Sequence, residues 1–274
     1  MKLLRPSRDH ARIVLDRAAH RNALGLDELR GIGRAADALA ADPPRVVSIV
    51  AQGAAFGVGG DIAALGAALD RGGMEAWLRE GLGAFHRGIA GLRALDAAIV
   101  VGVQGAAAGG TLGLVWVADH VIAGDDLLLD LAYARLGATP DGGTSWFAPR
   151  LAGRLRAFEL LTLTPRLDAQ SAVAYGLANR AVPAATLRDA VDDVVARWLA
   201  VPPESLRGIV RLLRDAPSRE LAGHLDAELE AFVRAAARPE FAERVAAFLR
   251  GKRPAGDPQA GRDTSTRFRS GSRT

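Results

Sequence analysis

Two short glycine-rich stretches are the part of the sequence best suited to chemistry. They are residues 55–61 (AFGVGGD) and residues 104–111 (QGAAAGGT). A glycine-rich turn that leads from a strand into a helix leaves backbone N–H groups unpaired and pointing outward. Two such turns brought together can direct two donors at one oxygen atom and stabilise negative charge that develops on it. The pattern therefore predicts an oxyanion hole.

Each stretch lies between a predicted strand and a predicted helix. The β-branched runs at residues 46–50 and 99–103 are typical of buried strands, and helical patterns follow both glycine stretches. Asp61 is expected to cap its helix, because an aspartate there accepts free amides and favours the helix dipole. Helical spacing also predicts helices over residues 26–41, 74–95, 204–215, 219–237 and 239–250.

Taken together, the two stretches resemble the enoyl-CoA hydratase/isomerase (crotonase) family. Phe-x-x-Gly-Gly-Asp begins at Phe56, Gly-x-x-x-Gly-Gly begins at Gly105, and an opening Arg-Asn-Ala-Leu begins at Arg21. The resemblance continues through residues 140–144 (PDGGT), 174–180 (AYGLANR), 239–241 (PEF) and 245–248 (VAAF).

This resemblance implies an α/β fold, a crotonase-like spiral of repeated ββα units with a C-terminal helical subdomain. The expected organisation is a spiral core over residues 1–200 and a helical trimerisation or lid region over residues 201–251. A basic disordered tail is expected over residues 252–274.

The resemblance also implies roles for single residues. Family members place the amides that match Gly60 and Gly110 in the oxyanion hole. Arg21 matches a residue near the phosphates of coenzyme A, although a solvated arginine is an equally ordinary interpretation. Further contacts with coenzyme A or the acyl group are implied for Ala23, Leu24, Val58, Gly59 and Ile62.

The two glutamates that hydratases of this family use are missing. Gly113 and Tyr133 stand at the positions where they are expected. Adding water across a double bond needs a base to activate the water and an acid to protonate carbon. Ordinary hydratase activity is therefore not expected.

One carboxylate remains in a suggestive place, Asp141 in residues 137–144 (GATPDGGT). In relatives resembling the ring-opened epoxide isomerase and some Δ3,Δ2-enoyl-CoA isomerases, an aspartate in this loop faces the acyl chain. A single carboxylate suits an isomerase, which moves one proton between two carbons. The alternative is a turn and N-cap residue, since Pro-Asp-Gly-Gly is an ordinary turn sequence. Tyr133 and Trp146 are candidates for the wall of the acyl pocket. The alternative for Tyr133 is a phenol that donates a proton or a hydrogen bond, and the alternative for Trp146 is a core position.

The predicted reaction is migration of a double bond in an enoyl-CoA, with Gly60 and Gly110 stabilising the enolate and Asp141 moving the proton. Two alternatives stay open, a hydratase with another water-activating group and a non-catalytic acyl-CoA-binding partner subunit. His86 lies among apolar residues at helical spacing, which favours a structural histidine over a general base. A Clp-type serine peptidase is not favoured, because Ser145 has no identifiable histidine partner and no Gly-x-Ser-x-Gly elbow occurs.

Composition narrows the protein class further. The 274 residues are 49% hydrophobic, enough for a sizeable core, and the absence of cysteine excludes disulfides and thiolate metal sites. No metal is expected, and no cofactor beyond the coenzyme A of a substrate thioester. The net charge of +4 equals that of residues 252–274, so the basic balance does not indicate a nucleic-acid surface on the folded body.

Targeting signals are not apparent either. No apolar run is long enough to span a membrane, and the first residues lack the apolar segment of a signal peptide. We therefore expect a soluble cytoplasmic protein without membrane contact. The resemblance implies a homotrimer or a dimer of trimers.

Overall fold

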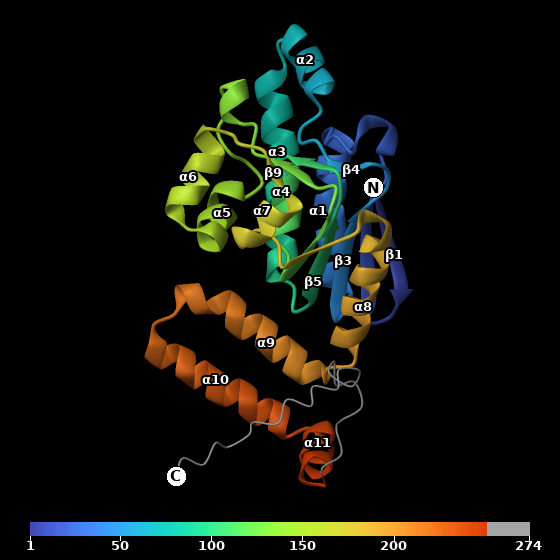
Figure 1. Ribbon diagram of the computed structural model, residues 1–274, viewed down its shortest axis with the longest axis vertical. Helices are drawn as coiled ribbons and strands as arrows, with labels where there is room; N and C mark the ends of the chain where they lie inside the picture. Colours follow the sequence, from blue (N-terminus) through green and yellow to red (C-terminus); the bar gives the residue numbers. More distant parts are fainter. Residues whose placement is uncertain (251–274) are drawn as a thin grey trace, which may run out of the picture.

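The computed structural model describes residues 1–250, so the predicted basic tail lies outside the described residues. It contains an α/β body and a layer of C-terminal helices below it (Figure 1). The strands are β1 Lys2–Ser7, β2 His10–Leu15, β3 Val46–Ala51, β4 Ala55–Gly57, β5 Ala98–Val103, β6 Ala106–Ala108, β7 His120–Gly124, β8 Leu128–Asp130, β9 Leu167–Asp168 and β10 Arg180–Val182. The helices are α1 Leu26–Ala41, α2 Ile62–Asp70, α3 Met74–Ala94, α4 Thr111–Trp116, α5 Thr144–Ala152, α6 Arg154–Thr162, α7 Ala169–Ala174, α8 Leu187–Leu199, α9 Pro203–Asp215, α10 Leu221–Ala236 and α11 Pro239–Leu249.

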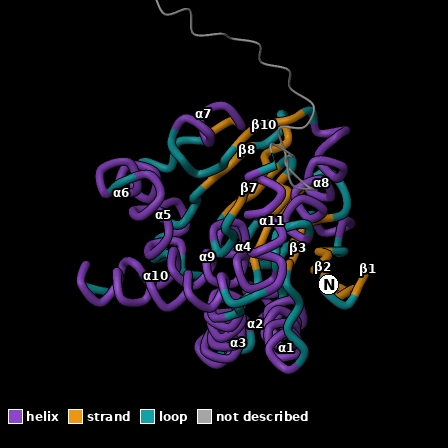
Figure 2. Tube along the Cα trace, turned by 90° about the horizontal axis from the view of Figure 1, so that it is seen from below, coloured by secondary structure: helices purple, strands orange, loops and turns teal. Residues whose placement is uncertain are grey.

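The larger sheet has the order β1-β2-β3-β5-β7-β10, and all its pairs except β1 with β2 are parallel. Its central strands β3 and β5 are largely apolar on both faces, as expected for parallel strands covered on both sides. Val47 and Ile49 of β3 face the core that contains α1 and α3, whereas Val46 and Val50 face α8. Figure 2 shows this order of layers, with α1 and α3 side by side on one face of the strands and α8 on the other.

Two glycines set how closely α1 and α3 approach each other. A Cβ atom on Gly88 of α3 would lie 2.9 Å from the backbone nitrogen of Gly33 in α1. Any side chain at residue 88 would therefore push the helices apart. This close packing fixes α3, which carries a residue of the candidate site.

The smaller sheet, β4-β6-β8-β9, brings the two glycine stretches together. β4 and β6 are parallel, with Gly57 paired to Ala107. Parallel strands end at the same edge of a sheet, so the turns that follow β4 and β6 leave it side by side. This is the arrangement that the proposed oxyanion hole requires.

The C-terminal helices are joined to the body through Arg214 of α9, whose side chain is only 7% exposed. Its guanidinium donates to the carbonyl oxygens of Arg93 at 3.0 Å, Leu95 at 2.5 Å and Ala97 at 3.0 Å. It also pairs with Asp119 at 2.6 Å. One side chain thus binds the loop that joins α3 to β5. Among residues 1–250, no helix is both long and apolar enough to cross a bilayer.

The predicted α/β class and the predicted helices and strands agree with this structure to within a few residues at their ends. Several strands were not predicted, among them β1, which carries Lys2 and Arg5 and is largely exposed. It forms by antiparallel pairing with β2, for which its own apolar pattern gives no signal.

Candidate active site

The two glycine turns touch each other through their backbones. A Cβ atom on Gly59 would lie 3.2 Å from the carbonyl oxygen of Ala108, and one on Gly109 would lie 3.5 Å from the Cα of Gly59. Both glycines have left-handed φ angles, +89° and +53°. Glycine is needed here because both the backbone conformation and the close approach disfavour a side chain.

The residues that follow, Gly60 and Gly110, carry the two predicted oxyanion donors. Within residues 1–250, neither amide donates to another protein group. Gly110 is the N-cap of α4, so its N–H lies at the positive end of that helix. Gly60 is exposed, and a Cβ atom built on it would meet nothing within 4 Å. The arrangement therefore leaves two free donors on adjoining turns.

The predicted coenzyme A segment is tied to the first turn by an isolated parallel bridge. The Leu24 amide donates to the Gly59 carbonyl at 2.8 Å, and the Asp61 amide donates to the Leu24 carbonyl at 3.0 Å. Ala23 and Leu24 are buried, whereas Arg21 is exposed with a φ of +51°. The structure thus brings residues 23 and 24 to the first turn and leaves the Arg21 side chain in solvent.

Asp61 caps α2, as the sequence predicts. Its carboxylate accepts the Ala64 amide at 3.1 Å. The Ala64 amide and the Arg17 guanidinium, 2.7 Å from Asp61, hold the pKa of this carboxyl below its usual range. Arg17 also donates to the Ala23 carbonyl at 3.0 Å, so it joins the coenzyme A segment to the start of α2. This role of Arg17 was not predicted from the sequence.

Asp141 lies directly against the second turn. A Cβ atom on Gly110 would be 2.7 Å from Oδ1 of Asp141. The same oxygen accepts the Tyr133 hydroxyl at 2.8 Å. The N-cap of α5 is Gly143, with no side-chain cap, so Asp141 does not cap this helix, although it does begin the turn that the alternative predicts.

The surroundings of Asp141 and Tyr133 favour the protonated form of each group. Burial raises the pKa of Asp141, and the hydrogen bond from Tyr133 acts in the opposite direction. Burial and the neighbouring Asp141 carboxylate also raise the pKa of the Tyr133 phenol. Tyr133 thus remains a hydrogen-bond donor, and Asp141 becomes a stronger base than an exposed aspartate.

The loop that carries Asp141 is a tight turn. The Thr144 amide and hydroxyl donate to the Asp141 carbonyl at 3.0 and 2.9 Å. Gly142 and Gly143 between them have φ angles of +58° and +82°. Two consecutive left-handed residues explain the Gly-Gly pair, because other residues rarely adopt this conformation.

The sequence favours a structural role for His86 over a general base. The structure places His86 on an exposed part of α3, where it contacts a backbone amide. Its Nε2 accepts the amide of Gly142 at 3.1 Å, next to Asp141. Helical spacing could not reveal this contact, because the partner belongs to a loop far away in the sequence.

A cavity of about 440 Å³ lies between α3 and α5, and Asp141, His86, Arg93, Trp146 and Phe147 are among its lining residues. Trp146 stacks edge-on against Phe147, with ring centroids 4.9 Å apart, and is 43% exposed. The alternative of a core position for Trp146 is therefore wrong.

The remaining predicted contacts are spread over the first turn. Val58 is half-buried, and Ile62, the first residue of α2, is 56% exposed. Within residues 1–250, no three His, Asp or Glu side chains cluster as ligands for a metal ion would.

Comparison with known proteins places this site in a family. The sequence profile described as enoyl-CoA hydratase/isomerase matches residues 8–255. The chain belongs to the enoyl-CoA hydratase/isomerase family.

Individual relatives differ in their named activities. The chain is 29% identical over 165 residues to the 4-chlorobenzoyl coenzyme A dehalogenase-1 of Arthrobacter sp, covering 60% of this chain and 59% of the relative. It is 33% identical over 164 residues to the 1,2-epoxyphenylacetyl-CoA isomerase of Escherichia coli, covering 60% and 62%. The chain thus spans about three fifths of the length of these two relatives. A Mycobacterium tuberculosis protein named as an enoyl-CoA hydratase, EchA14, is 33% identical over 259 residues, 89% of this chain and 96% of the relative.

Solved structures agree on the fold. A Mycobacterium abscessus protein of the enoyl-CoA hydratase/isomerase type superposes with a TM-score of 0.85 at 30% identity, over 92% of this chain and 97% of that one. The protein has the crotonase fold.

Packing explains why residue 113, where the resemblance leads us to expect a glutamate, is a glycine. A Cβ atom there would overlap the carbonyl oxygen of Gly142. The loop that carries Asp141 therefore fills the space that a side chain at residue 113 would need. Residue 133, the second glutamate position, is the tyrosine that donates to Asp141.

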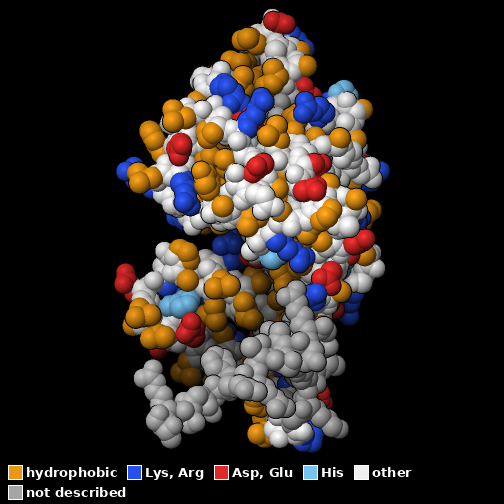
Figure 3. Space-filling view, in the orientation of Figure 1, with side chains coloured by type: hydrophobic (Ala, Val, Ile, Leu, Met, Phe, Trp, Pro, Cys, Tyr) orange, Lys and Arg blue, Asp and Glu red, His pale blue; other side chains and the backbone are white. Residues whose placement is uncertain are grey.

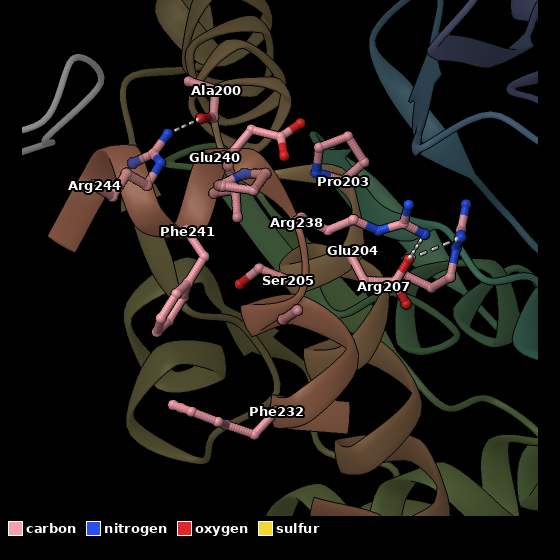
Figure 4. A pocket seen from close by; sticks show the side chains of 13 residues that line it. Ala200, Pro203, Glu204, Ser205, Arg207, Phe232, Arg238, Glu240, Phe241 and Arg244 are labelled. Atoms are coloured by element: carbon pink, nitrogen blue, oxygen red, sulfur yellow. Dashed lines mark hydrogen bonds and ion pairs between the residues drawn. The ribbon is translucent and has the colours of Figure 1, made fainter. Parts of the chain in front are cut away.

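A larger cavity, of about 760 Å³, lies away from this site among α9, α10 and α11 (Figure 4). Glu204 lies 3.5 Å from Arg207 and 3.8 Å from Arg238 there. Arg244 donates to the Ala200 carbonyl at 3.0 Å. The polar groups of this cavity are largely paired with one another, and it contains none of the predicted site residues.

Proposed function

We propose that this protein shifts a double bond in an enoyl-CoA through a thioester enolate. Gly60 and Gly110 donate to the thioester oxygen, and Asp141 moves the proton. The observation that carries the proposal is the position of Asp141, a partly buried carboxylate whose Oδ1 lies against Gly110. The names of several relatives, which include CoA-ester isomerases and hydratases, support the substrate class.

The reaction needs only one proton-transfer group. The Asp141 carboxylate removes a proton from C2 of a 3-enoyl-CoA, and the electron pair delocalises into the thioester carbonyl to give a dienolate. The Gly60 and Gly110 amides stabilise the oxygen that gains negative charge. The protonated Asp141 then returns the same proton to C4, which leaves the double bond between C2 and C3 in conjugation with the carbonyl.

The surroundings of Asp141 suit this role. Burial raises its pKa towards the working pH, where a general base is most effective. Tyr133 donates to Oδ1 and so directs the carboxylate while leaving the second oxygen free of this bond. Arg21, Ala23, Leu24, Val58 and Gly59 are proposed to bind coenzyme A, with Ile62 and Trp146 beside the acyl group.

Water addition is the second candidate. His86 and Asp141 line one cavity, and His86 is exposed, so an imidazole lies where water has access. Against it, the Nε2 atom of His86 is already occupied by the Gly142 amide. A non-catalytic acyl-CoA-binding subunit is the third candidate.

The experiment incubates the purified protein with 3-enoyl-CoA esters of several chain lengths in D₂O. We expect ultraviolet absorbance of the conjugated 2-enoyl-CoA to appear without a gain in mass equal to one water. Asp141→Asn should lower this rate by at least about a hundredfold, the scale of general-base catalysis, while CoA-ester binding persists. A product heavier by one water would favour the hydratase, and binding without turnover would favour the silent subunit.

We also propose that the protein assembles as a homotrimer or a dimer of trimers through its C-terminal helices. Figure 3 shows hydrophobic side chains gathered over this layer. Leu221, Leu225, Leu229 and Val233 of α10 recur every four residues and are 52–72% exposed. Such a stripe on a helix is typical of a face that packs against a partner.

A further inference from the structure

The peptide group between Asp141 and Gly142 is held at both ends. Its carbonyl oxygen, from Asp141, accepts the Thr144 amide and hydroxyl. Its N–H, from Gly142, donates to Nε2 of His86 at 3.1 Å. The Thr144 contacts lie within the turn itself, whereas the His86 contact ties the turn to another element, α3.

This tie matters because the turn contains two consecutive glycines with left-handed φ angles. Glycine has the widest conformational freedom of all residues, so such a turn does not hold its orientation by itself. The plane of the 141–142 peptide sets the direction in which the Cα–Cβ bond of Asp141 points. Fixing that plane from α3 therefore fixes where the carboxylate lies relative to Gly110.

We propose that His86 is a positioning residue that holds Asp141 in place through the Gly142 amide, and that protonation of His86 releases the loop. This inference rests on the proposed role of Asp141 in proton transfer. Nε2 can accept the amide hydrogen only while it carries no proton, so the working form is the neutral imidazole with its proton on Nδ1. In the imidazolium, Nε2–H would face the Gly142 N–H, and the hydrogen bond would be lost.

Three charged side chains lie near the cavity that His86 lines. Asp141 faces it from the loop before α5, and Arg93 shares the cavity from α3 itself. From α5, Arg150 lies 3.9 Å from the ring centroid of Trp146, which lines the same cavity. A positive charge on His86 would also lower the pKa of Asp141 and make it a weaker base. Both effects of protonation therefore reduce the rate.

Two variants separate positioning from simple packing. In His86→Gln the side-chain carbonyl oxygen can replace Nε2 as the acceptor, but it does not titrate. In His86→Leu no acceptor remains. We expect His86→Leu to lower kcat by about tenfold to a hundredfold with little change in KM, the scale of a carboxylate displaced by about 1 Å. His86→Gln should retain kcat within a few-fold. In this variant, any fall in rate at low pH that is caused by protonation of His86 should disappear.

A second measurement does not depend on turnover. Nitrogen-15 NMR of the resting protein should find Nε2 of His86 unprotonated near neutral pH, and hydrogen exchange of the Gly142 amide should accelerate in His86→Leu but not in His86→Gln. These results would support the tie even if no enoyl-CoA were converted, which would count against the proposed function alone. A protonated Nε2 at neutral pH, or a His86→Leu variant with wild-type kcat and pH profile, would overturn the inference.

Discussion

At the scale of single residues, the site depends on a balance of two effects on Asp141. Burial raises the pKa of its carboxyl, and the Tyr133 hydroxyl, which stabilises the ionised form, lowers it. Tyr133 occupies the position where the resemblance leads us to expect the second glutamate of a hydratase. Unlike a glutamate, it does not supply a second base. Its hydroxyl instead adjusts the pKa of the partly buried Asp141 carboxyl beside the second glycine turn.

The Tyr133→Phe variant tests this balance. Without the hydroxyl, the pKa of Asp141 should rise further, so the base form appears only at higher pH. We expect the acidic limb of kcat/KM against pH to move to higher pH, with a plateau close to that of the wild type. The measurement is the pH profile of 3-enoyl-CoA isomerisation. Tyr175→Phe is the matched control, because Tyr175 packs under Arg156 elsewhere in the protein. An unmoved limb in Tyr133→Phe would contradict the role given to the hydroxyl.

At the scale of elements, the loop before α5 packs so closely on helix α4 that residue 113 has no room for a side chain. Gly113 of α4 has no room for a Cβ atom because the Gly142 carbonyl oxygen lies in its place. In this chain, the loop that carries Asp141 therefore leaves no room for a side chain at residue 113.

The Gly113→Ala variant should therefore push the loop outward. Overpacking of this kind typically destabilises a protein by about 1–3 kcal/mol, and the displaced Asp141 should lower isomerisation by about a hundredfold. Denaturant unfolding and initial rates measure the two effects. Gly223→Ala in α10 is the control, since a Cβ atom there meets nothing within 4 Å and alanine favours a helix. If Gly113→Ala and Gly223→Ala had equal stability and equal activity, the loop before α5 would accommodate a side chain at residue 113, and the prediction would be wrong.

Much of this arrangement was predictable from local patterns. Apolar spacing predicted α1 and α3, and the β-branched runs predicted β3 and β5, because these signals arise within each segment. The contacts of Gly113 with Gly142, and of His86 with the same residue, were not predictable. Each joins segments that are distant in the sequence, and a glycine or an exposed histidine carries no local sign of what will pack against it. Arg17 was missed for the same reason, since its partner Asp61 belongs to another element.

At the scale of the whole molecule, the C-terminal helices are joined to the body through α9. Leu206 and Val210 of α9 are buried in a core shared with α8 and β5, and Arg214 contacts three carbonyl oxygens and Asp119. The outer face of α10 meanwhile leaves large apolar side chains exposed. A layer held in this way gains stability when a partner covers it.

We expect the double variant Leu221→Asp and Leu229→Asp to dissociate the proposed trimer into monomers, because two charges on an apolar face would have to be buried without partners. Light scattering coupled to size-exclusion chromatography measures the mass in solution. Glu230→Lys changes the charge on another face of α10 and should leave the trimer intact. A wild-type protein that is monomeric at all concentrations, or a double variant that stays trimeric, would refute the role of this face.

The isolated bridge between Leu24 and Gly60 joins the segment proposed to hold coenzyme A to the turn proposed to hold the reacting oxygen. Binding of the nucleotide part of coenzyme A, far from the bonds that change, can thus help to position the Gly60 amide beside the thioester oxygen. In such an enzyme the nucleotide does more than anchor the substrate, since its binding energy also stabilises the transition state. A thioester stripped of its nucleotide should then react more slowly even when the protein is saturated with it.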